Sequence, residues 1–319
     1  MPRFDIHHIT KYTYEGPVRD SANQIVLFPV KDEYQEVLKQ ELTITGEPVV
    51  DVHKDYYGNE IGSFTQAEPH SSLTIDSRLE IITKPRPALK DEVEKETQWA
   101  HLVEVRSQVA YIDFLKQEQF ASLAEVLESV CPEKARGQTP LAAALQLRNY
   151  VFDHFKYIKG ITSVESTLDE VWKLKAGVCQ DFAHILLVLL RQIHIPARYV
   201  SGYICPNRNG MRGEGATHAW IEAYIPYNGW VGLDPTNNCV AEDLHVRLAV
   251  GRSFSDCSPV KGTYKGTAGQ KLEVGVSVSY EGGGATEDMD TVLAQQPTAD
   301  RGDINSYRRY MEMMQQQQQ

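Results

Sequence analysis

One cysteine lies where a protein chain can make a thiol nucleophilic. Cys179 follows Gly177-Val178 and begins a strongly apolar segment that ends before Pro196. Such a segment predicts a buried helix, and the unpaired N–H groups and positive dipole at a helix start favour a thiolate over a thiol. The pattern indicates thiolate chemistry at Cys179. The ordinary alternative is a buried cysteine that packs as a small hydrophobic residue.

Thiolate chemistry needs a base and a group that orients the base. His218 stands near the start of a predicted strand, residues 217–225, and Asp234 follows the next predicted strand, residues 230–233. Adjacent antiparallel strands could bring the two side chains together. Each residue also has an ordinary alternative: a histidine on an apolar strand is often a core residue, and an aspartate before Pro-Thr often forms a turn.

The elements that would position these residues begin near residue 91, where the apolar period becomes helical. Two helix starts carry a capping signature, Ser122 with Glu125 and Thr167 with Glu170, and a third begins at Thr139-Pro140 with proline at the first helical position. Strands follow at residues 198–204, 217–225, 230–233 and 272–280, and we expect residues 241–270 to be mostly loop. Helices followed by strands predict an α+β domain over residues 91–280. We expect its last strand, residues 272–280, to pack on the sheet of this domain or on that of the N-terminal domain.

The N-terminal part of the chain has a different pattern. Apolar residues alternate with polar ones over residues 3–83, which predicts an antiparallel β-sandwich domain over residues 1–85. Lys84-Pro85-Arg86-Pro87 then breaks the pattern, which indicates a linker or an edge. At the other end, residues 285–319 are polar and rich in glutamine, so we expect a disordered tail. The overall fold class is therefore α+β with an N-terminal β domain.

Composition excludes several classes of function. The 319 residues carry a net charge of −11 and no basic, aromatic-interleaved block, so nucleic acid is not an expected partner. We expect neither a secretory signal nor a membrane span, because no sufficiently long apolar run occurs, and we predict a cytoplasmic protein. Five cysteines without a C-x-x-C pair argue against disulfides and structural zinc. No calcium-binding spacing is present, so no cofactor is expected.

Three segments in this order resemble the motifs of the transglutaminase-like superfamily: G-V-C-Q-D-F-A-H at 177–184, T-H-A-W-I-E-A-Y at 217–224 and G-L-D-P-T-N at 232–237. Residues 1–85 and 250–264 resemble parts of a bacterial branch of that superfamily. The resemblance implies a papain/transglutaminase-like core with Cys179 as nucleophile, His218 as general base and acid, and Asp234 as the carboxylate that orients the imidazole.

The resemblance further implies acyl transfer at an amide of a peptide or protein, through a thioester. Attack by water would make the protein a cysteine peptidase or amidase, which we favour. Attack by an amine would make it a transglutaminase, and a non-catalytic peptide-binding module is the alternative from another class.

The remaining residues of these motifs have supporting roles in the prediction. Asp181 and His184 are interpreted as helix-packing or supporting residues, with zinc ligation as the alternative. Trp172 and Trp220 could line an acyl pocket, although buried tryptophans are usually core residues. The glycine-rich residues 210–215 are interpreted as a lip of the cleft.

Overall fold

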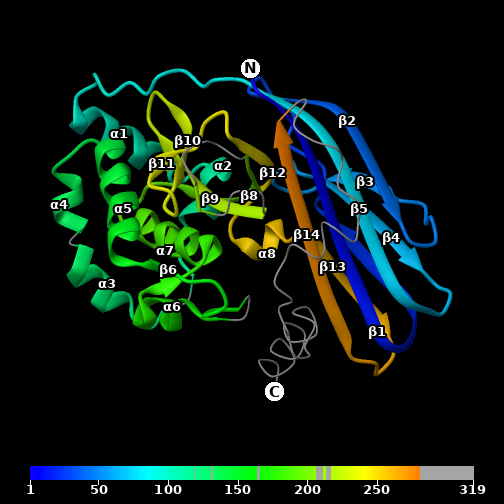
Figure 1. The fold of residues 1–319 in the computed structure, drawn as a ribbon. Helices are drawn as coiled ribbons and strands as arrows, with labels where there is room; N and C mark the ends of the chain where they lie inside the picture. The colour runs from blue at the N-terminus through cyan, green and yellow to red at the C-terminus, as the bar shows by residue number, and fades with distance from the viewer. Residues whose placement is uncertain (119, 131, 164–165, 206–210, 213–216, 281–319) are drawn as a thin grey trace.

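The computed structural model describes residues 1–118, 120–130, 132–163, 166–205, 211–212 and 217–280. A large antiparallel sheet lies beside a region that combines helices with a smaller sheet (Figure 1). The predicted α+β class is confirmed. The predicted tail and most of the predicted lip lie outside the described residues. None of the described helices has the length and apolar character needed to cross a membrane.

The N-terminal strands are β1 (Arg3–Ile25), β2 (Gln35–Ile44), β3 (Asp51–Lys54), β4 (Glu60–Gln66) and β5 (His70–Thr83). β1 pairs with β5 along its first half and with β4 along its second half. The strands follow the order β2-β5-β1-β4-β3 and, with two further strands that also pair with β1, make one sheet of seven strands. The sequence predicts a sandwich for this region, and the sharing of β1 joins its strands into this one sheet. Burial of every second residue in β5 explains the period of two in this region.

Those two further strands come from the C-terminal part of the chain. β13 (Val260–Lys265) and β14 (Gln270–Tyr280) both pair with β1, and Ile6 faces Val278 in that ladder. The strand predicted at residues 272–280 is therefore confirmed, and its partner is the N-terminal sheet. The predicted division of the chain at residue 91 remains a prediction, but residues 260–280 belong to the N-terminal sheet by their hydrogen bonds.

The prediction of loop for residues 241–270 is wrong. This segment contains β12 (His245–Gly251), α8 (Phe254–Cys257) and β13. All seven residues of β12 are buried, so the strand shows no alternation between a wet and a dry face. Arg247 also interrupts the apolar run of β12, which makes the strand harder to predict from the sequence.

The helices of the second region are α1 (Lys95–Val105), α2 (Val109–Ile112), the 3-10 turn η1 (Asp113–Leu115), α3 (Leu123–Val130), α4 (Pro132–Arg136), α5 (Pro140–His154), α6 (Leu168–Leu174) and α7 (Cys179–Gln192). The capping box predicted at α6 is present, since Thr167 and Glu170 exchange bonds of 2.8 and 3.3 Å. Ser122 behaves differently: its hydroxyl donates to Asp169 at 2.6 Å. The bond to Asp169 ties the start of α3 to α6.

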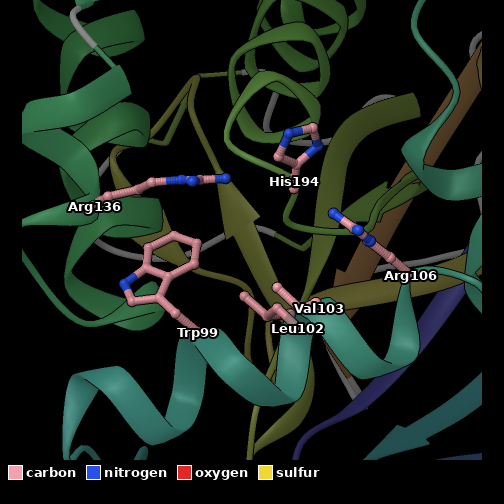
Figure 2. A pocket seen from close by; sticks show the side chains of 6 residues that line it. All are labelled: Trp99, Leu102, Val103, Arg106, Arg136 and His194. Carbon is pink, nitrogen blue, oxygen red and sulfur yellow. The ribbon is translucent and has the colours of Figure 1, made fainter.

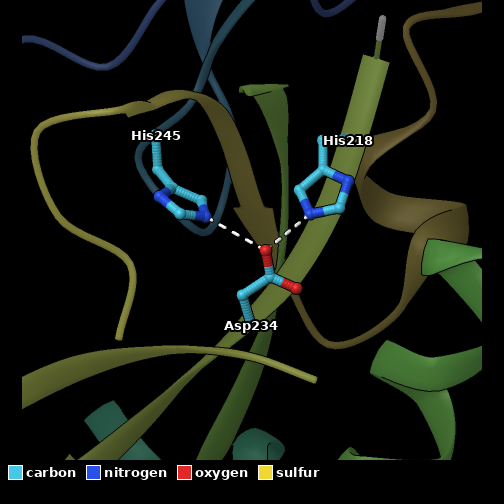
Figure 3. Close-up of side chains that lie close together, drawn as sticks. All are labelled: His218, Asp234 and His245. Carbon is cyan, nitrogen blue, oxygen red and sulfur yellow. Dashed lines mark hydrogen bonds and ion pairs between the residues drawn. The ribbon is translucent and has the colours of Figure 1, made fainter. Parts of the chain in front are cut away.

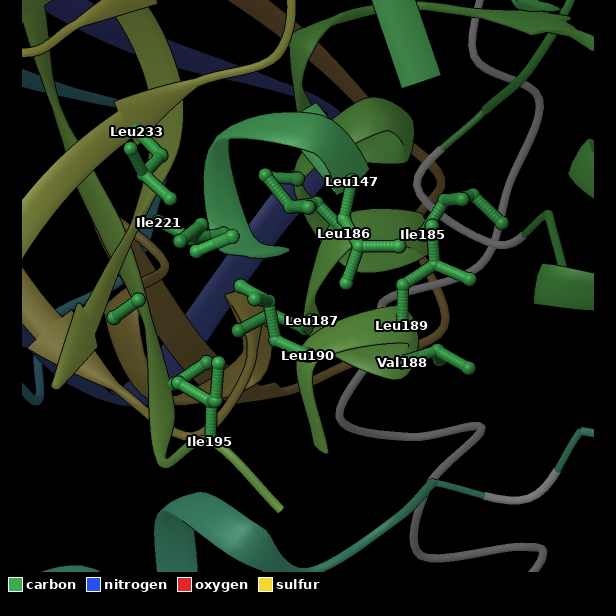
Figure 4. Close-up of a cluster of buried hydrophobic side chains, with 14 of the residues drawn as sticks. Leu147, Ile185, Leu186, Leu187, Val188, Leu189, Leu190, Ile195, Ile221 and Leu233 are labelled. Carbon is green, nitrogen blue, oxygen red and sulfur yellow. The ribbon is translucent and has the colours of Figure 1, made fainter. Parts of the chain in front are cut away.

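The second sheet has the order β11-β10-β9-β8-β12 and is covered by α7. Its strands besides β12 are β8 (Ala197–Ile204), β9 (Thr217–Ile225), β10 (Gly229–Asp234) and β11 (Cys239–Val240), while β6 (Lys156–Tyr157) and β7 (Ala176–Gly177) form a separate pair. Leucines of α7 pack toward Ile221 and Leu233 of the sheet (Figure 4). Burial of each such side chain contributes about 1.5–3 kcal/mol, so the helix that begins at Cys179 is firmly anchored.

β12 is the edge strand that faces the N-terminal region, and two side-chain amides from that region pair with its backbone. Gln35 donates to the carbonyl of Arg247 and accepts its N–H, both at 2.8 Å. Asn59 does the same for Val250, at 2.7 and 2.8 Å. These amides take the place of a neighbouring strand, so the N-terminal region fixes the position of β12.

Candidate active site

Cys179 is the first residue of α7, and its half-buried thiol is free. The carboxylate of Asp181 accepts the N–H of Val178 at 2.8 Å and the hydroxyl of Thr162 at 2.7 Å. This places Asp181 under the backbone just before the helix. Gly177 must be glycine there, because a Cβ would lie 2.4 Å from an oxygen of Asp181. Asp181 therefore supports the helix start that carries the thiol, as the sequence predicts.

His218 and Asp234 meet as predicted, through the antiparallel pairing of β9 with β10. The Nε2 atom of His218 lies 2.8 Å from Oδ2 of Asp234, and both side chains are fully buried (Figure 3). The other ring nitrogen, Nδ1, is buried without a hydrogen-bond partner of good geometry in the described part of the chain. The Cys179 side chain is close enough to interact electrostatically with this imidazole.

The charges of this pair support each other. Burial alone lowers the pKa of His218, but the carboxylate of Asp234, with a smaller contribution from Cys179, raises that pKa to about 10. Burial likewise raises the pKa of Asp234, yet the bonded imidazoles hold it well below its usual range. At neutral pH the pair is therefore an imidazolium beside a carboxylate. Such an imidazolium can serve as the counterion of a thiolate and as a proton donor.

The carboxylate of Asp234 is held from several sides. Its Oδ1 accepts the backbone N–H of Thr236 at 2.8 Å and that of Asn237 at 3.2 Å. Its Oδ2 accepts the side-chain amide of Asn237 at 2.8 Å, in addition to His218. Asp234 thus also forms the turn that its sequence context suggested, so the turn and the pairing with His218 are both present.

A second histidine, missed from the sequence, bonds to the same oxygen. Nε2 of His245, the first residue of β12, lies 3.1 Å from Oδ2 of Asp234, and His245 is buried (Figure 3). The sequence prediction omits His245 because it assigns residues 241–270 mostly to loop. The available signal was the short apolar run that begins at a histidine, His245-Val-Arg-Leu-Ala-Val-Gly.

The ligand atoms of His218, Asp234 and His245 lie within 4.8 Å of one another, close enough to hold a metal ion. Their hydrogen bonds fit a different use. Oδ2 already accepts from two imidazoles and from the amide of Asn237, so its lone pairs are occupied by N–H donors. The arrangement suits a carboxylate that orients imidazoles better than a zinc centre, which requires unprotonated imidazole nitrogens.

The other predicted residues lie around this centre or away from it. His184 accepts the N–H of Phe254 at 3.1 Å, which makes it a packing residue of α7, as predicted. Trp220 stacks on His218 with ring centroids 6.1 Å apart. Trp172 is fully buried against Phe155, which agrees with the core role that is usual for buried tryptophans.

A hollow of about 80 Å³ opens near the opposite end of α7, just beyond the C-terminus of that helix. It is lined by Trp99, Leu102, Val103, Arg106, Arg136 and His194 (Figure 2). None of the predicted site residues lines it. The candidate site is therefore located by the cluster of titratable side chains and not by this hollow.

Comparison with known proteins places these features in a family. Residues 129–235 match the model of the transglutaminase-like superfamily, and residues 4–82 match that of the bacterial transglutaminase-like N-terminal region. An uncharacterised Mycobacterium leprae protein is 31% identical over 283 residues, 88% of this chain and 99% of that protein. A Pseudomonas aeruginosa protein-glutamine gamma-glutamyltransferase is 29% identical over 119 residues, 36% of this chain and 18% of that protein.

A crystal structure from Cytophaga hutchinsonii, named as a candidate cysteine protease, superposes with a TM-score of 0.70 at 20% identity. The match covers 92% of this chain and 96% of that one, so the two share a fold over nearly their whole lengths. Together with the thiol, histidine and aspartate of the three motifs, these matches establish that the chain belongs to the transglutaminase-like superfamily.

Proposed function

We propose that the protein transfers acyl groups from amides, with Cys179 as nucleophile, His218 as proton carrier and Asp234 as the group that orients His218. The observation that carries this proposal is the buried 2.8 Å pair of His218 and Asp234 beside a free thiol at a helix start. A non-catalytic peptide-binding module has no need of a charged pair whose burial is costly. The alternative from that class is therefore disfavoured.

The first half-reaction follows from these positions. The Cys179 thiolate attacks the carbonyl carbon of an amide, and the carbonyl electron pair moves to oxygen, where N–H groups at the start of α7 can stabilise the charge. His218 then donates a proton to the amide nitrogen as the C–N bond breaks. An amine leaves and a thioester remains on Cys179.

The second half-reaction regenerates the thiolate. His218, now neutral, accepts a proton from water as the water oxygen attacks the thioester carbon, and the C–S bond breaks to release a carboxylic acid. A primary amine in place of water would give a new amide. Asp234 holds the imidazole throughout and stabilises its protonated form.

We propose hydrolysis of a peptide or isopeptide bond as the main outcome. The Cytophaga protein named as a candidate cysteine protease matches this chain over 92% of its length, whereas the Pseudomonas gamma-glutamyltransferase matches over 36%. Transamidation is the second candidate, favoured by the name of that relative and by the thioester that both reactions share.

The test is turnover of a panel of peptides and isopeptides, followed by mass spectrometry with and without an added primary amine. Cys179→Ala should abolish turnover. Cys205→Ala should retain it, because Cys205 is a buried thiol that packs with the core residues of the N-terminal sheet. Turnover that survives in Cys179→Ala would refute the proposal. Covalent incorporation of the amine in preference to water would replace hydrolysis by transamidation, and binding without turnover in the unmodified protein would favour the binding module.

A further inference from the structure

His245 is buried and titratable and bonds to Asp234, but the proposed mechanism gives it no role. It reaches the site from β12, outside the residues 129–235 that match the superfamily core. We propose that His245 is a positioning residue, held in place by the N-terminal region, that fixes the Asp234 carboxylate against His218. This inference rests on the proposed function for its catalytic consequence, but the geometry it invokes can be measured separately.

His245 holds Oδ2 of Asp234 from a second side, in addition to the Asn237 amide that bonds the same oxygen. Oδ2 receives His218 at 2.8 Å and His245 at 3.1 Å, as Figure 3 shows. A carboxylate oxygen bonded from two sides cannot rotate without breaking a charge-assisted bond, and such bonds are stronger than neutral ones. Loss of His245 would leave Oδ2 with only the Asn237 amide beside His218, so the orientation of the carboxylate toward His218 would be less firmly fixed.

The imidazole of His245 is itself fixed by packing. The ring of Trp220 meets it edge-on, with centroids 5.1 Å apart and planes at 74°, and stacks on His218 with its planes at 26°. One indole therefore aligns both imidazoles. Gly202 of β8 allows this close packing, because a Cβ there would lie 2.0 Å from the carbonyl oxygen of Val246 and 2.7 Å from Trp220.

The N-terminal region holds the strand that delivers His245. The amides of Gln35 and Asn59 close the free backbone edge of β12, and Arg247 forms an ion pair with Asp32 of the N-terminal region. β12 has β8 on its other edge. The N-terminal region therefore completes the site indirectly, through the position of His245.

The experiment compares two substitutions of His245. Gln retains an N–H donor near the place of Nε2, while Met fills a similar volume without a donor. His7→Met is the matched control, because His7 has the same exposure as His245, 7%, and also bonds to an aspartate, but to Asp76 within the N-terminal sheet. The readouts are kcat and KM, the rate at which iodoacetamide alkylates Cys179, and the titration of His218 followed by NMR of ¹⁵N-labelled imidazole.

His245→Met should lower kcat and the alkylation rate at neutral pH by about 10- to 100-fold, the range that loss of one charge-assisted bond allows. KM should be unchanged, and the His218 titration should move to lower pH. His245→Gln should restore most of each value, and His7→Met should change none. A His218 titration that His245→Met leaves unmoved would overturn the inference, as would equal losses in the Gln and Met variants. If the unmodified protein shows no turnover, the proposed function fails, while the NMR titration still decides the role of His245.

Discussion

Asp234→Asn removes the charge of the carboxylate and keeps the shape of the side chain, so it tests whether that charge keeps His218 protonated. With Asp234 present, the pKa of His218 is about 10, against an ordinary value of 6.5. At pH 7 this means about 1,000 protonated imidazoles for each neutral one. Without the carboxylate, burial should hold the pKa of His218 below 6.5 and the ratio below about 0.3. The imidazolium is therefore destabilised by about 5 kcal/mol or more.

The assay is alkylation of Cys179 by iodoacetamide between pH 5 and 10, because iodoacetamide reacts with the thiolate. Asp234→Asn should slow alkylation at pH 7 by about 100- to 1,000-fold, which leaves room for partial compensation by the helix dipole. Asp76→Asn is the control, since Asp76 also bonds to a histidine, His7 at 3.0 Å, but within the N-terminal sheet. Alkylation of Asp234→Asn within about threefold of the unmodified rate would refute the assigned charge balance.

Three further predictions follow from buried contacts. Gly177→Ala should lower the free energy of unfolding by about 1–3 kcal/mol and slow alkylation, because its Cβ would collide with Asp181; unchanged urea denaturation would contradict this. Burial lowers the pKa of His184 to about 4, so the native protein loses stability as the pH falls below 6.5. Between pH 7.5 and 5.0 the free energy of unfolding of His184→Gln should therefore fall by about 2 kcal/mol less than that of the unmodified protein in urea titrations. An equal fall in the two proteins would contradict this. Gln35→Leu should cost about 2–3 kcal/mol, since it removes both amide bonds to β12; an unchanged denaturation midpoint would show that those bonds contribute little.

Much of the site was predictable because its signals are local. The apolar segment after Cys179 forms α7, and the strands expected at residues 217–225 and 230–233 form β9 and β10. Their antiparallel pairing brings His218 to Asp234, as adjacent strands joined by a short turn are expected to do. The capping box at Thr167 is likewise set by residues three positions apart.

The features that escaped prediction depend on contacts between distant parts of the chain. β12 pairs with β8 on one edge and with the Gln35 amide on the other. All of its residues are buried, so a short apolar run is the only local sign of a strand within residues 245–251. The role of His245 is visible only once β12 lies beside β8. The pairing of β14 with β1 joins the two ends of the described chain, and local periodicity carries no information about which sheet a strand joins.

The most direct measurement is the alkylation rate of each cysteine in the native protein at neutral pH, determined by peptide mapping after limited exposure to iodoacetamide. Burial raises the pKa of Cys239 to about 12 and those of Cys205 and Cys257 well above their usual range, so these thiols should react slowly. Cys179 should be modified at least about tenfold faster than these three, and this lead should vanish in Asp234→Asn. Comparable rates for Cys179 and Cys239 in the native protein would contradict an activated thiolate at the start of α7.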